Sequence, residues 1–314
     1  MKIPITVIAT TSPAEASLPH AVRRRTALIA PRNAIDQIGA TGMLLAGCVT
    51  VSEPTTYFRT PGCECCAIRE DLIASVIRAV RRTEPPEQLL VVVDPSTDDL
   101  LTVISTLLSS FEISRRCSLD SVVVHLDAVE MATRLATAGR VVDVELEPAV
   151  AIADLLIVSG FDRVTQSARR SVSTALHERA GFARSVESTG DRILENPLDA
   201  WHGAPTARLV AAEREGTPST VVLRVADPLD PDAIDEWLNL LVAQHASRLF
   251  RMQGALSVAG NDERVCCFGV RSFAVSHSES EHPRHRSTES VLAVCGVGLD
   301  AQELAASFES TVMS

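Results

Sequence analysis

Leu89-Leu90-Val91-Val92-Val93 is apolar at every position, a pattern typical of a strand that is buried on both faces of a sheet. Other short apolar runs recur along the first half of the chain, at Ile3–Ile8, Met43–Val51, Ser121–Leu126 and Leu155–Val158. Longer stretches between several of them have helical spacing, at Arg69–Arg82, Asp98–Ser110 and Thr165–Ala180. Buried strands separated by helices predict a doubly wound α/β domain with a mostly parallel sheet over residues 1–190.

The chain changes character over residues 191–218, where prolines and glycines are frequent, and we predict a linker there. Beyond it, residues 219–314 contain strand patterns at Thr220–Val225, Gly254–Val258, Arg264–Val270, Ser272–Ser276 and Val291–Cys295, and helical patterns at Asp230–His245 and Asp300–Phe308. Grouped strands with two helices predict a small second domain of the α+β class.

The composition of the 314-residue chain excludes several classes of protein. With 46% hydrophobic and 22% charged residues it can bury a large core, unlike a disordered chain. A net charge of −11 argues against direct binding of nucleic acid, which requires clustered positive charge. The sequence shows neither an export signal nor an apolar run of about 18 residues, so we expect a cytoplasmic protein without a membrane segment.

Three cysteines fall within four residues in the stretch Gly62-Cys63-Glu64-Cys65-Cys66. In a reducing compartment, cysteines this closely spaced bind metal or react more often than they form disulfides. A proline and a glycine before them predict a turn, with a helix from Arg69, and a helix N-terminus favours the thiolate form. We predict that Cys63, Cys65 and Cys66 bind zinc, with a fourth ligand from a distant side chain, water or a partner.

Other cysteines and histidines have less specific patterns. The polar stretch Ser276–Arg286 is expected to be a loop and offers candidate auxiliary metal ligands at His277, His282 and His285, although a plain solvated loop is the alternative. Cys266 and Cys267 are adjacent in a strand pattern, so they point to opposite faces and cannot easily share a metal. Single cysteines are usually small buried side chains, which we expect of Cys48, Cys117 and Cys295. His125 lies in an apolar strand and is expected to be a core histidine with satisfied hydrogen bonds.

The cysteine stretch and two later segments resemble one known family. Gly62–Leu72 reads Gly-Cys-Glu-Cys-Cys-Ala-Ile-Arg-Glu-Asp-Leu and resembles the Gly-Cys-x-Cys-Cys-x-x-Arg-x-Asp-Leu signature of the CobW-type metallochaperone GTPases. Arg248–Leu256 and Val291–Asp300 resemble the opening and closing segments of that family's C-terminal domain. The resemblance implies a P-loop NTPase-like first domain over 1–190 and a CobW C-terminal-like domain over 219–314.

The same resemblance exposes departures at the nucleotide site. The stretch Ala9–Ser17, where the family carries its P-loop, has neither glycine nor lysine, and Lys2 is the only lysine of the chain. The family's guanine-reading Asn-Lys-x-Asp corresponds to Ser159-Gly160-Phe161-Asp162, in which only the aspartate remains. Asp94 follows the apolar run at 89–93 and corresponds to the family's Walker B aspartate, which would meet a metal-bound water if a nucleotide were present. Asp94 and Asp162 are therefore remnant nucleotide contacts or ordinary strand-end residues, and binding of GTP with magnesium is not expected.

Three functions are consistent with these patterns. The first is a zinc-binding metal-homeostasis protein on a CobW-type scaffold without GTP hydrolysis. It would act through a client or ribosome-associated partner, as the resemblance to zinc-starvation-linked actinobacterial members implies. The second is a GTP-dependent metallochaperone that inserts zinc or cobalt into a client enzyme. The third is a redox sensor in which the cysteines form a disulfide. The sequence does not decide whether two chains form a homodimer that shares one metal.

Overall fold

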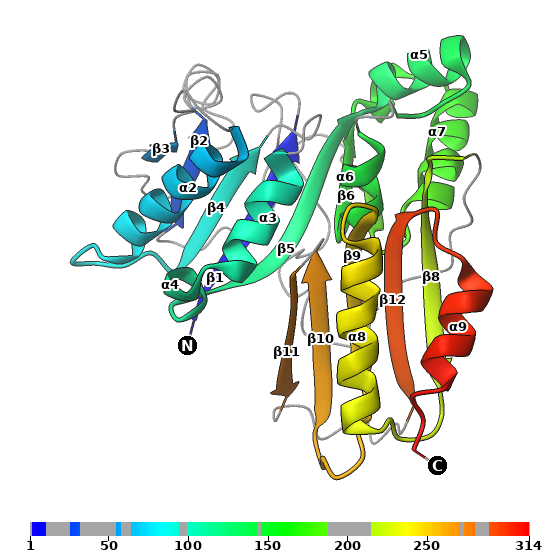
Figure 1. Ribbon diagram of the computed structural model, residues 1–314. Coiled ribbons are helices and arrows are strands. Elements are labelled where there is room, and N and C mark those ends of the chain that lie inside the picture. Colours follow the sequence, from blue (N-terminus) through cyan, green and yellow to red (C-terminus); the bar gives the residue numbers. More distant parts are fainter. Residues whose placement is uncertain are drawn as a thin grey trace. The chain divides into compact units, whose positions relative to one another are not determined.

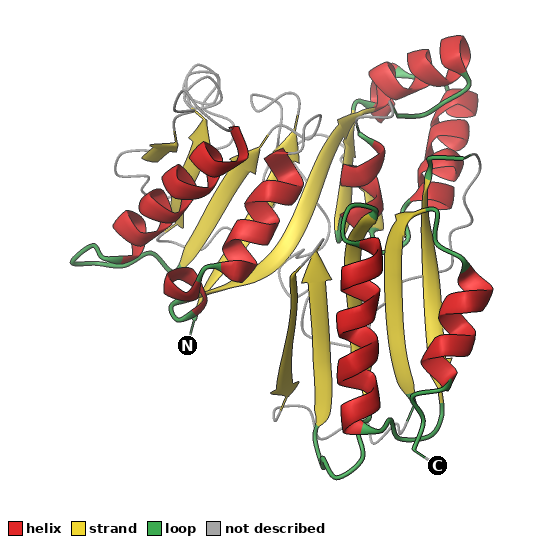
Figure 2. Cartoon of the chain, viewed as in Figure 1, coloured by secondary structure: helices red, strands yellow, loops and turns green. Residues whose placement is uncertain are grey.

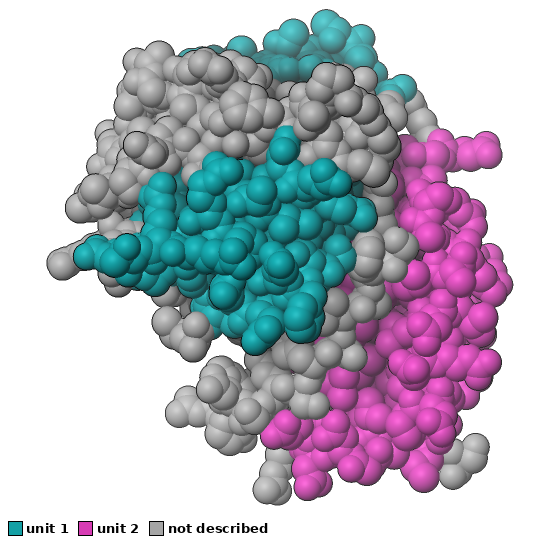
Figure 3. Space-filling view, turned by 60° about the vertical axis from the view of Figure 1, so that its left-hand side comes forward, with its two compact units in different colours: residues 1–177, 183–201 teal, residues 178–182, 202–314 magenta. Residues whose placement is uncertain are grey.

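The computed structural model describes residues 2–10, 26–31, 55–57, 64–93, 99–142, 146–187, 215–270, 273–279 and 289–313. The chain divides into two compact units, coloured separately in Figure 3. The first comprises residues 1–177 and 183–201, and the second comprises residues 178–182 and 202–314. Most of the predicted linker at 191–218 lies outside the described residues, so its boundaries stay a prediction.

The first unit contains a seven-stranded sheet in the order β3-β2-β4-β1-β5-β6-β7, and every neighbouring pair is parallel. The strands are β1 (Ile3–Thr10), β2 (Thr26–Pro31), β3 (Thr55–Tyr57), β4 (Gln88–Val93), β5 (Cys117–Asp127), β6 (Leu155–Ser159) and β7 (Arg184–Glu187). All six residues of β4 are buried, as its continuous apolar pattern predicts. The parallel α/β class is therefore confirmed.

The helices of this unit are α2 (Glu64–Val80), α3 (Asp99–Ser109), α4 (Phe111–Ser114), α5 (Ala128–Ala138), α6 (Glu147–Ile152), the 3-10 helix η1 (Phe161–Arg163) and α7 (Gln166–Arg179). Figure 1 shows α2 and α3 side by side over one face of the sheet. The prediction that the helix after the cysteines starts at Arg69 is wrong, because α2 begins at Glu64. Cys65 and Cys66 therefore belong to its first turn, where an acidic residue such as Glu64 is favourable.

The second unit contains a five-stranded antiparallel sheet in the order β11-β10-β9-β12-β8. Its strands are β8 (Pro218–Val225), β9 (Leu249–Leu256), β10 (Arg264–Val270), β11 (Phe273–Glu279) and β12 (Ser290–Val297). The helices α8 (Pro231–His245) and α9 (Ala301–Glu309) lie on one face of this sheet (Figure 2). This arrangement confirms the predicted α+β domain.

The two helices of the second unit start where their sequences favour it. The carboxylate of Asp230 accepts hydrogen bonds from the backbone N–H groups of Asp232 and Ala233, at 3.0 and 2.9 Å. Pro231 follows at the first helical position, where its missing N–H costs nothing. Asp300 caps α9 in the same way. Both helices bury an apolar face against the sheet, with Trp237 and Phe308 in contact at a centroid distance of 5.2 Å.

Two predicted boundaries in this domain are wrong. β9 starts at Leu249 rather than at Gly254, because pairing with β12 extends it. β11 runs to Glu279, so His277 lies within a strand and not in a loop. The polar residues at its end suggested a loop, but all seven residues of β11 pair with β10. Within the described ranges, no helix combines the length and the apolar character needed to cross a membrane.

The short segment before β7 packs with the second unit. A Cβ atom added to Gly181 would lie 2.3 Å from the hydroxyl oxygen of Thr220, so only glycine fits this close approach. The guanidinium of the buried Arg251 stacks over the ring of Phe182 at 4.4 Å. These contacts explain why residues 178–182 group with β8 and β9 although the sequence continues from α7.

Candidate functional site at the carboxyl edge of the parallel sheet

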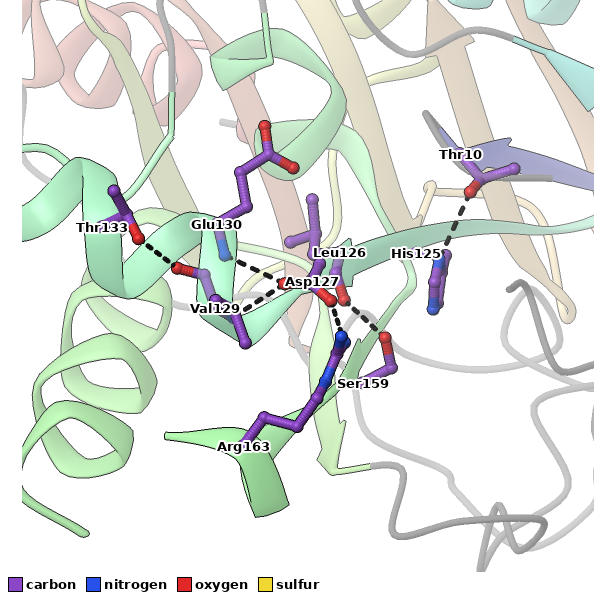
Figure 4. Close-up of polar contacts among 9 residues, drawn as sticks. All are labelled: Thr10, His125, Leu126, Asp127, Val129, Glu130, Thr133, Ser159 and Arg163. Carbon is purple, nitrogen blue, oxygen red and sulfur yellow. Dashed lines mark hydrogen bonds and ion pairs between the residues drawn. The ribbon is translucent and has the colours of Figure 1, made fainter. Parts of the chain in front are cut away.

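The carboxyl ends of β1, β5 and β6 meet at one edge of the first sheet, because these neighbouring strands are parallel. The chain leaves β1 toward β2 on one side and reaches β5 and β6 on the other, so β1 is the topological switch point. Open α/β sheets bind their ligands at this point. The side chains that end these strands, Thr10, His125, Asp127 and Ser159, are drawn in Figure 4.

Asp127 joins the end of β5 to the start of α5. Its Oδ1 atom accepts hydrogen bonds from the backbone N–H groups of Val129, at 2.8 Å, and Glu130, at 2.9 Å, which caps the helix. Its Oδ2 atom forms an ion pair with the guanidinium of Arg163 (Figure 4). Both carboxylate oxygens of Asp127 are therefore occupied by groups of the protein itself.

The loop after β6 adopts a conformation that suits glycine. Gly160 has a φ of 76°, in the left-handed region, and precedes the single turn of η1. A Cβ atom at this position would lie 2.5 Å from Nη2 of Arg163, so the guanidinium fills the space beside the bare backbone. Phe161 is buried and anchors the turn, whereas Asp162 is exposed. Any side chain at position 160 would require Arg163 to move.

His125 is a buried histidine beside the end of β1. It is directly paired with Thr10 in the ladder, and its Nδ1 atom lies 3.3 Å from the hydroxyl of Thr10. Burial lowers its pKa to about 4, with partial opposition from the nearby Asp127 carboxylate, so the imidazole is neutral at physiological pH. Nε2 has no hydrogen-bond partner among the described residues. The expectation of a core histidine holds for its burial, but only one ring nitrogen is satisfied.

The predicted site residues lie on several elements. Cys65 and Cys66 are the second and third residues of α2, Asp162 lies in η1, and His277 lies in β11 of the second unit. Four residues lie outside the described part: Cys63, Asp94, His282 and His285. Among the described residues, no three His, Cys, Asp or Glu side chains converge on one point.

The cysteine helix and the loop after β6 belong to distant parts of the sheet. α2 follows β3, and five strand spacings separate β3 from β6, which corresponds to about 24 Å. The structure therefore does not bring Cys65 and Asp162 together. Sequence reasoning missed Asp127 and Arg163, although an aspartate between an apolar strand and a helix is a recognisable N-cap signal.

Comparison with known protein families matches both halves of the chain. The model described as the CobW/HypB/UreG nucleotide-binding domain matches residues 20–185, and the cobalamin synthesis protein CobW C-terminal domain matches residues 219–312. The chain belongs to the CobW/HypB/UreG family. The match to the nucleotide-binding domain begins at residue 20, beyond the Ala9–Ser17 stretch that stands in place of a P-loop.

Solved structures with the same fold include the zinc-bound YjiA GTPase from Escherichia coli, with 16% identity, a TM-score of 0.68 and complete coverage of both chains. A zinc-bound triple mutant of YjiA, with a glutamate and two cysteines changed to alanine, matches with 17% identity and a TM-score of 0.66, again over both complete chains. At this identity the likeness shows the CobW fold alone. A search of curated protein sequences found no match.

The CobW family implies a nucleotide, and the loop after β6 tests whether guanine fits. The lysine of the family's Asn-Lys-x-Asp motif corresponds to Gly160, whose side-chain space Arg163 occupies. Asp162 is the predicted counterpart of the guanine-reading aspartate, but no lysine accompanies it. The described residues after β6 therefore do not reproduce the family's Asn-Lys-x-Asp pattern. Cys65 and Cys66, which belong to the first turn of α2, are of a residue type that binds soft metals such as zinc.

Proposed function

We propose that this chain is a zinc-binding metal-homeostasis protein on a CobW scaffold, which does not hydrolyse GTP and acts through a partner protein. The observation that carries the proposal is the Arg163–Asp127 ion pair beside Gly160, which occupies the place of the base-reading lysine. The absence of any lysine other than Lys2 supports it, since no side chain is left to play the P-loop lysine.

Zinc would be held by Cys63, Cys65 and Cys66. Two of these residues open α2, where the partial positive charge of the helix N-terminus stabilises thiolate and hence the metal complex. Three ligands from one segment leave the fourth zinc position for a side chain, water or a partner. His277, His282 and His285 are proposed as auxiliary ligands. A partner that supplies or removes the fourth ligand would sense zinc supply, and a ribosome-associated protein in the cytoplasm is the proposed partner class.

Zinc content and nucleotide binding test this proposal together. The protein is purified without chelator or oxidation, its zinc is counted by elemental analysis, and GTP with magnesium is titrated calorimetrically. We expect Cys65→Ser to lower the zinc content by about one equivalent per chain and GTP to give no binding heat. Cys117→Ala is the matched control, because this buried cysteine lies outside the motif.

Two other outcomes point to the alternative functions. Micromolar GTP binding, or magnesium-dependent release of phosphate, would contradict the proposal and favour a GTP-dependent metallochaperone, which family membership also supports. Absence of metal in both the parent protein and Cys65→Ser, with a disulfide detected by mass spectrometry, would favour a cysteine redox sensor.

A further inference from the structure

The amino edge of the parallel sheet, where its strands begin, brings three segments together. Helix α2 connects β3 to the parallel β4, so it runs back from the carboxyl edge and ends at the amino edge. α4 lies just before β5 and packs against α2 and α3. The backbone N–H of Ile3 donates to the carbonyl of Arg116 at 2.8 Å, and Figure 1 shows α4 next to the N-terminus.

These three segments, namely Lys2, residues 78–87 and residues 111–116, carry an excess of cations and are called the basic edge below. The cations are Lys2, Arg78, Arg81, Arg82, Arg115 and Arg116, and the carboxylates are Glu84, Glu87 and Glu112. Six cations and three carboxylates give a formal charge of +3, whereas the whole chain carries −11. All six cations except Arg82 are exposed, and none of those five forms an ion pair with another described residue. Their mutual repulsion is therefore not offset within the described part of the chain.

The basic edge also exposes an aromatic ring. Phe111 opens α4 and is 73% exposed, more than any other large hydrophobic residue of the described part. The guanidinium of Arg115 lies 5.6 Å from the centroid of its ring. One exposed apolar residue alone is ordinary on a protein surface. An exposed ring among arginines, however, combines two residue types that are enriched in protein interfaces.

A short acidic peptide fits the basic edge better than a nucleic acid does. Five of its six cations are arginines, whose planar guanidinium binds a carboxylate through two parallel hydrogen bonds. A nucleic acid presents a long line of phosphates, which a chain of net charge −11 repels outside the edge. A single exposed ring also offers no series of stacking platforms. An acidic segment with an apolar side chain needs only the cations and Phe111.

We propose that the basic edge docks an acidic segment of a partner protein, with its arginines on the carboxylates and Phe111 against an apolar side chain of the partner. The inference rests on the proposed function in that a partner protein is expected, and it adds where and by which chemistry that partner binds. Cys65 and Cys66 lie in the first turn of α2 and Arg78 in its last, about 20 Å away. The docking surface and the proposed zinc site therefore occupy opposite ends of one helix.

The test measures binding of a fluorescein-labelled peptide of repeated Glu-Glu-Leu triplets to the full chain by fluorescence anisotropy. We expect saturable binding that weakens at least about tenfold as salt rises from about 50 to about 300 mM. Arg81→Glu combined with Arg116→Glu should weaken binding at least about tenfold, and Phe111→Ala about fivefold. The matched control is Arg140→Glu combined with Arg170→Glu, which changes the charge of the same unit equally outside the basic edge. It should change the affinity less than about twofold.

Three results would overturn the docking surface. The acidic peptide may show no binding, a Gln-Gln-Leu peptide of the same length may bind equally well, or both pairs of charge reversals may weaken binding equally. Single-stranded RNA that binds more tightly than the peptide, and is lost in the same variants, would assign the edge to nucleic acid and overturn the proposal as well. If circular dichroism shows that the double reversal does not fold, Arg81→Gln combined with Arg116→Gln replaces it, and an unchanged affinity there counts against the edge.

Zinc content and GTP titration on the same samples keep this inference separate from the proposed function. Failure of peptide binding with zinc present and no heat from GTP counts against the docking surface alone. Missing zinc, or binding of GTP, with peptide binding retained counts against the proposed function alone.

Discussion

The loop corner between β5 and β6 and the strand edge at β10–β11 both carry groups that could bind a ligand, but they differ in how those groups are used. At the corner, Asp127 gives one oxygen to the N-terminus of α5 and the other to Arg163. At the edge, Arg264 donates to backbone carbonyls, while Cys266 stands partly exposed across from His277. The first region is closed by its own side chains, whereas at the second a cysteine of β10 stays partly exposed.

The closure of the corner does not rest on the strength of its ion pair. The side chains of Arg163 and Asp127 are 51% and 20% exposed, and ion pairs near water contribute less than about 1 kcal/mol. The shape of the loop matters more, because a left-handed Gly160 leaves room for the guanidinium where a side chain would otherwise stand. The shape of the backbone can therefore fill such a corner even where the ion pair itself contributes little free energy.

The largest expected effect is a difference in alkylation rate between the adjacent cysteines Cys266 and Cys267. With a pKa of about 12, Cys267 has a thiolate fraction about 10³ lower than a thiol of pKa 9, and its burial excludes reagent as well. We expect a maleimide to modify Cys266 at least about 100-fold faster than Cys267 in the native protein, mainly because Cys267 is buried. Mass spectrometry of peptides from a time course measures both rates, after Cys266→Ser and Cys267→Ala have separated the two signals.

Denaturant provides the control, since unfolding should bring the two rates within about tenfold of each other. Comparable labelling of both residues in the native state would mean that β10 does not present alternate faces to core and solvent. The partial exposure of Cys266 at this edge would then lose its structural basis.

The next effect concerns His125, which makes the corner sensitive to acid. Its pKa is lower in the folded state than the ordinary value of 6.5, so the unfolded chain takes up the proton first. The stability that it contributes is present above about pH 6.5 and is lost as pH falls toward 4. At pH 5 the loss is roughly 2 kcal/mol. His125→Gln should lose that much less stability between pH 7.5 and pH 5, as measured by urea unfolding at both values.

Equal losses for the parent protein and His125→Gln would mean that the imidazole is already protonated in the folded state. That result would place a compensating anion or water at Nε2, which has no partner among the described residues. Each variant serves as its own reference across pH, because any constant cost of the substitution cancels in the difference.

The sequence predicted the fold where one pattern dominates. The continuous apolar runs of β4 and β6 are best interpreted as buried strands. The apolar residues of α3 recur with the spacing of a helix, which predicts that element equally clearly. It failed for β2, whose apolar core of four residues is short, and for α5, where threonine and arginine interrupt the apolar positions. It also failed at His277, because pairing with β10 decides the conformation of a polar edge segment and no local pattern reports it.

The site was predictable only in part, for a similar reason. Cysteines at the start of α2 form a local motif, so their spacing carries the information. The Asp127–Arg163 pair joins residues 36 positions apart, and only the adjacency of β5 and β6 brings them together. The sequence shows that Gly160 replaces the lysine of the family motif. It does not show that the guanidinium of Arg163 fills the space beside this glycine.

The smallest expected effect tests directly whether the guanidinium of Arg163 fills the space beside Gly160. Gly160→Ala and Gly139→Ala both place a side chain on a left-handed backbone, which costs about 1–2 kcal/mol in each case. Nothing lies within 4 Å of a Cβ at Gly139, whereas a Cβ at Gly160 displaces Arg163 and breaks its ion pair. We expect Gly160→Ala to be less stable than Gly139→Ala by about 0.5–1 kcal/mol in urea unfolding. In an Asp127→Asn background the excess should vanish, because the ion pair is already absent while the helix cap is retained. If Gly160→Ala is still the less stable variant in the Asp127→Asn background, Arg163 fills the corner through packing alone. If Gly160→Ala and Gly139→Ala are equally stable in both backgrounds, the corner is open to a ligand. That result would restore a case for nucleotide binding.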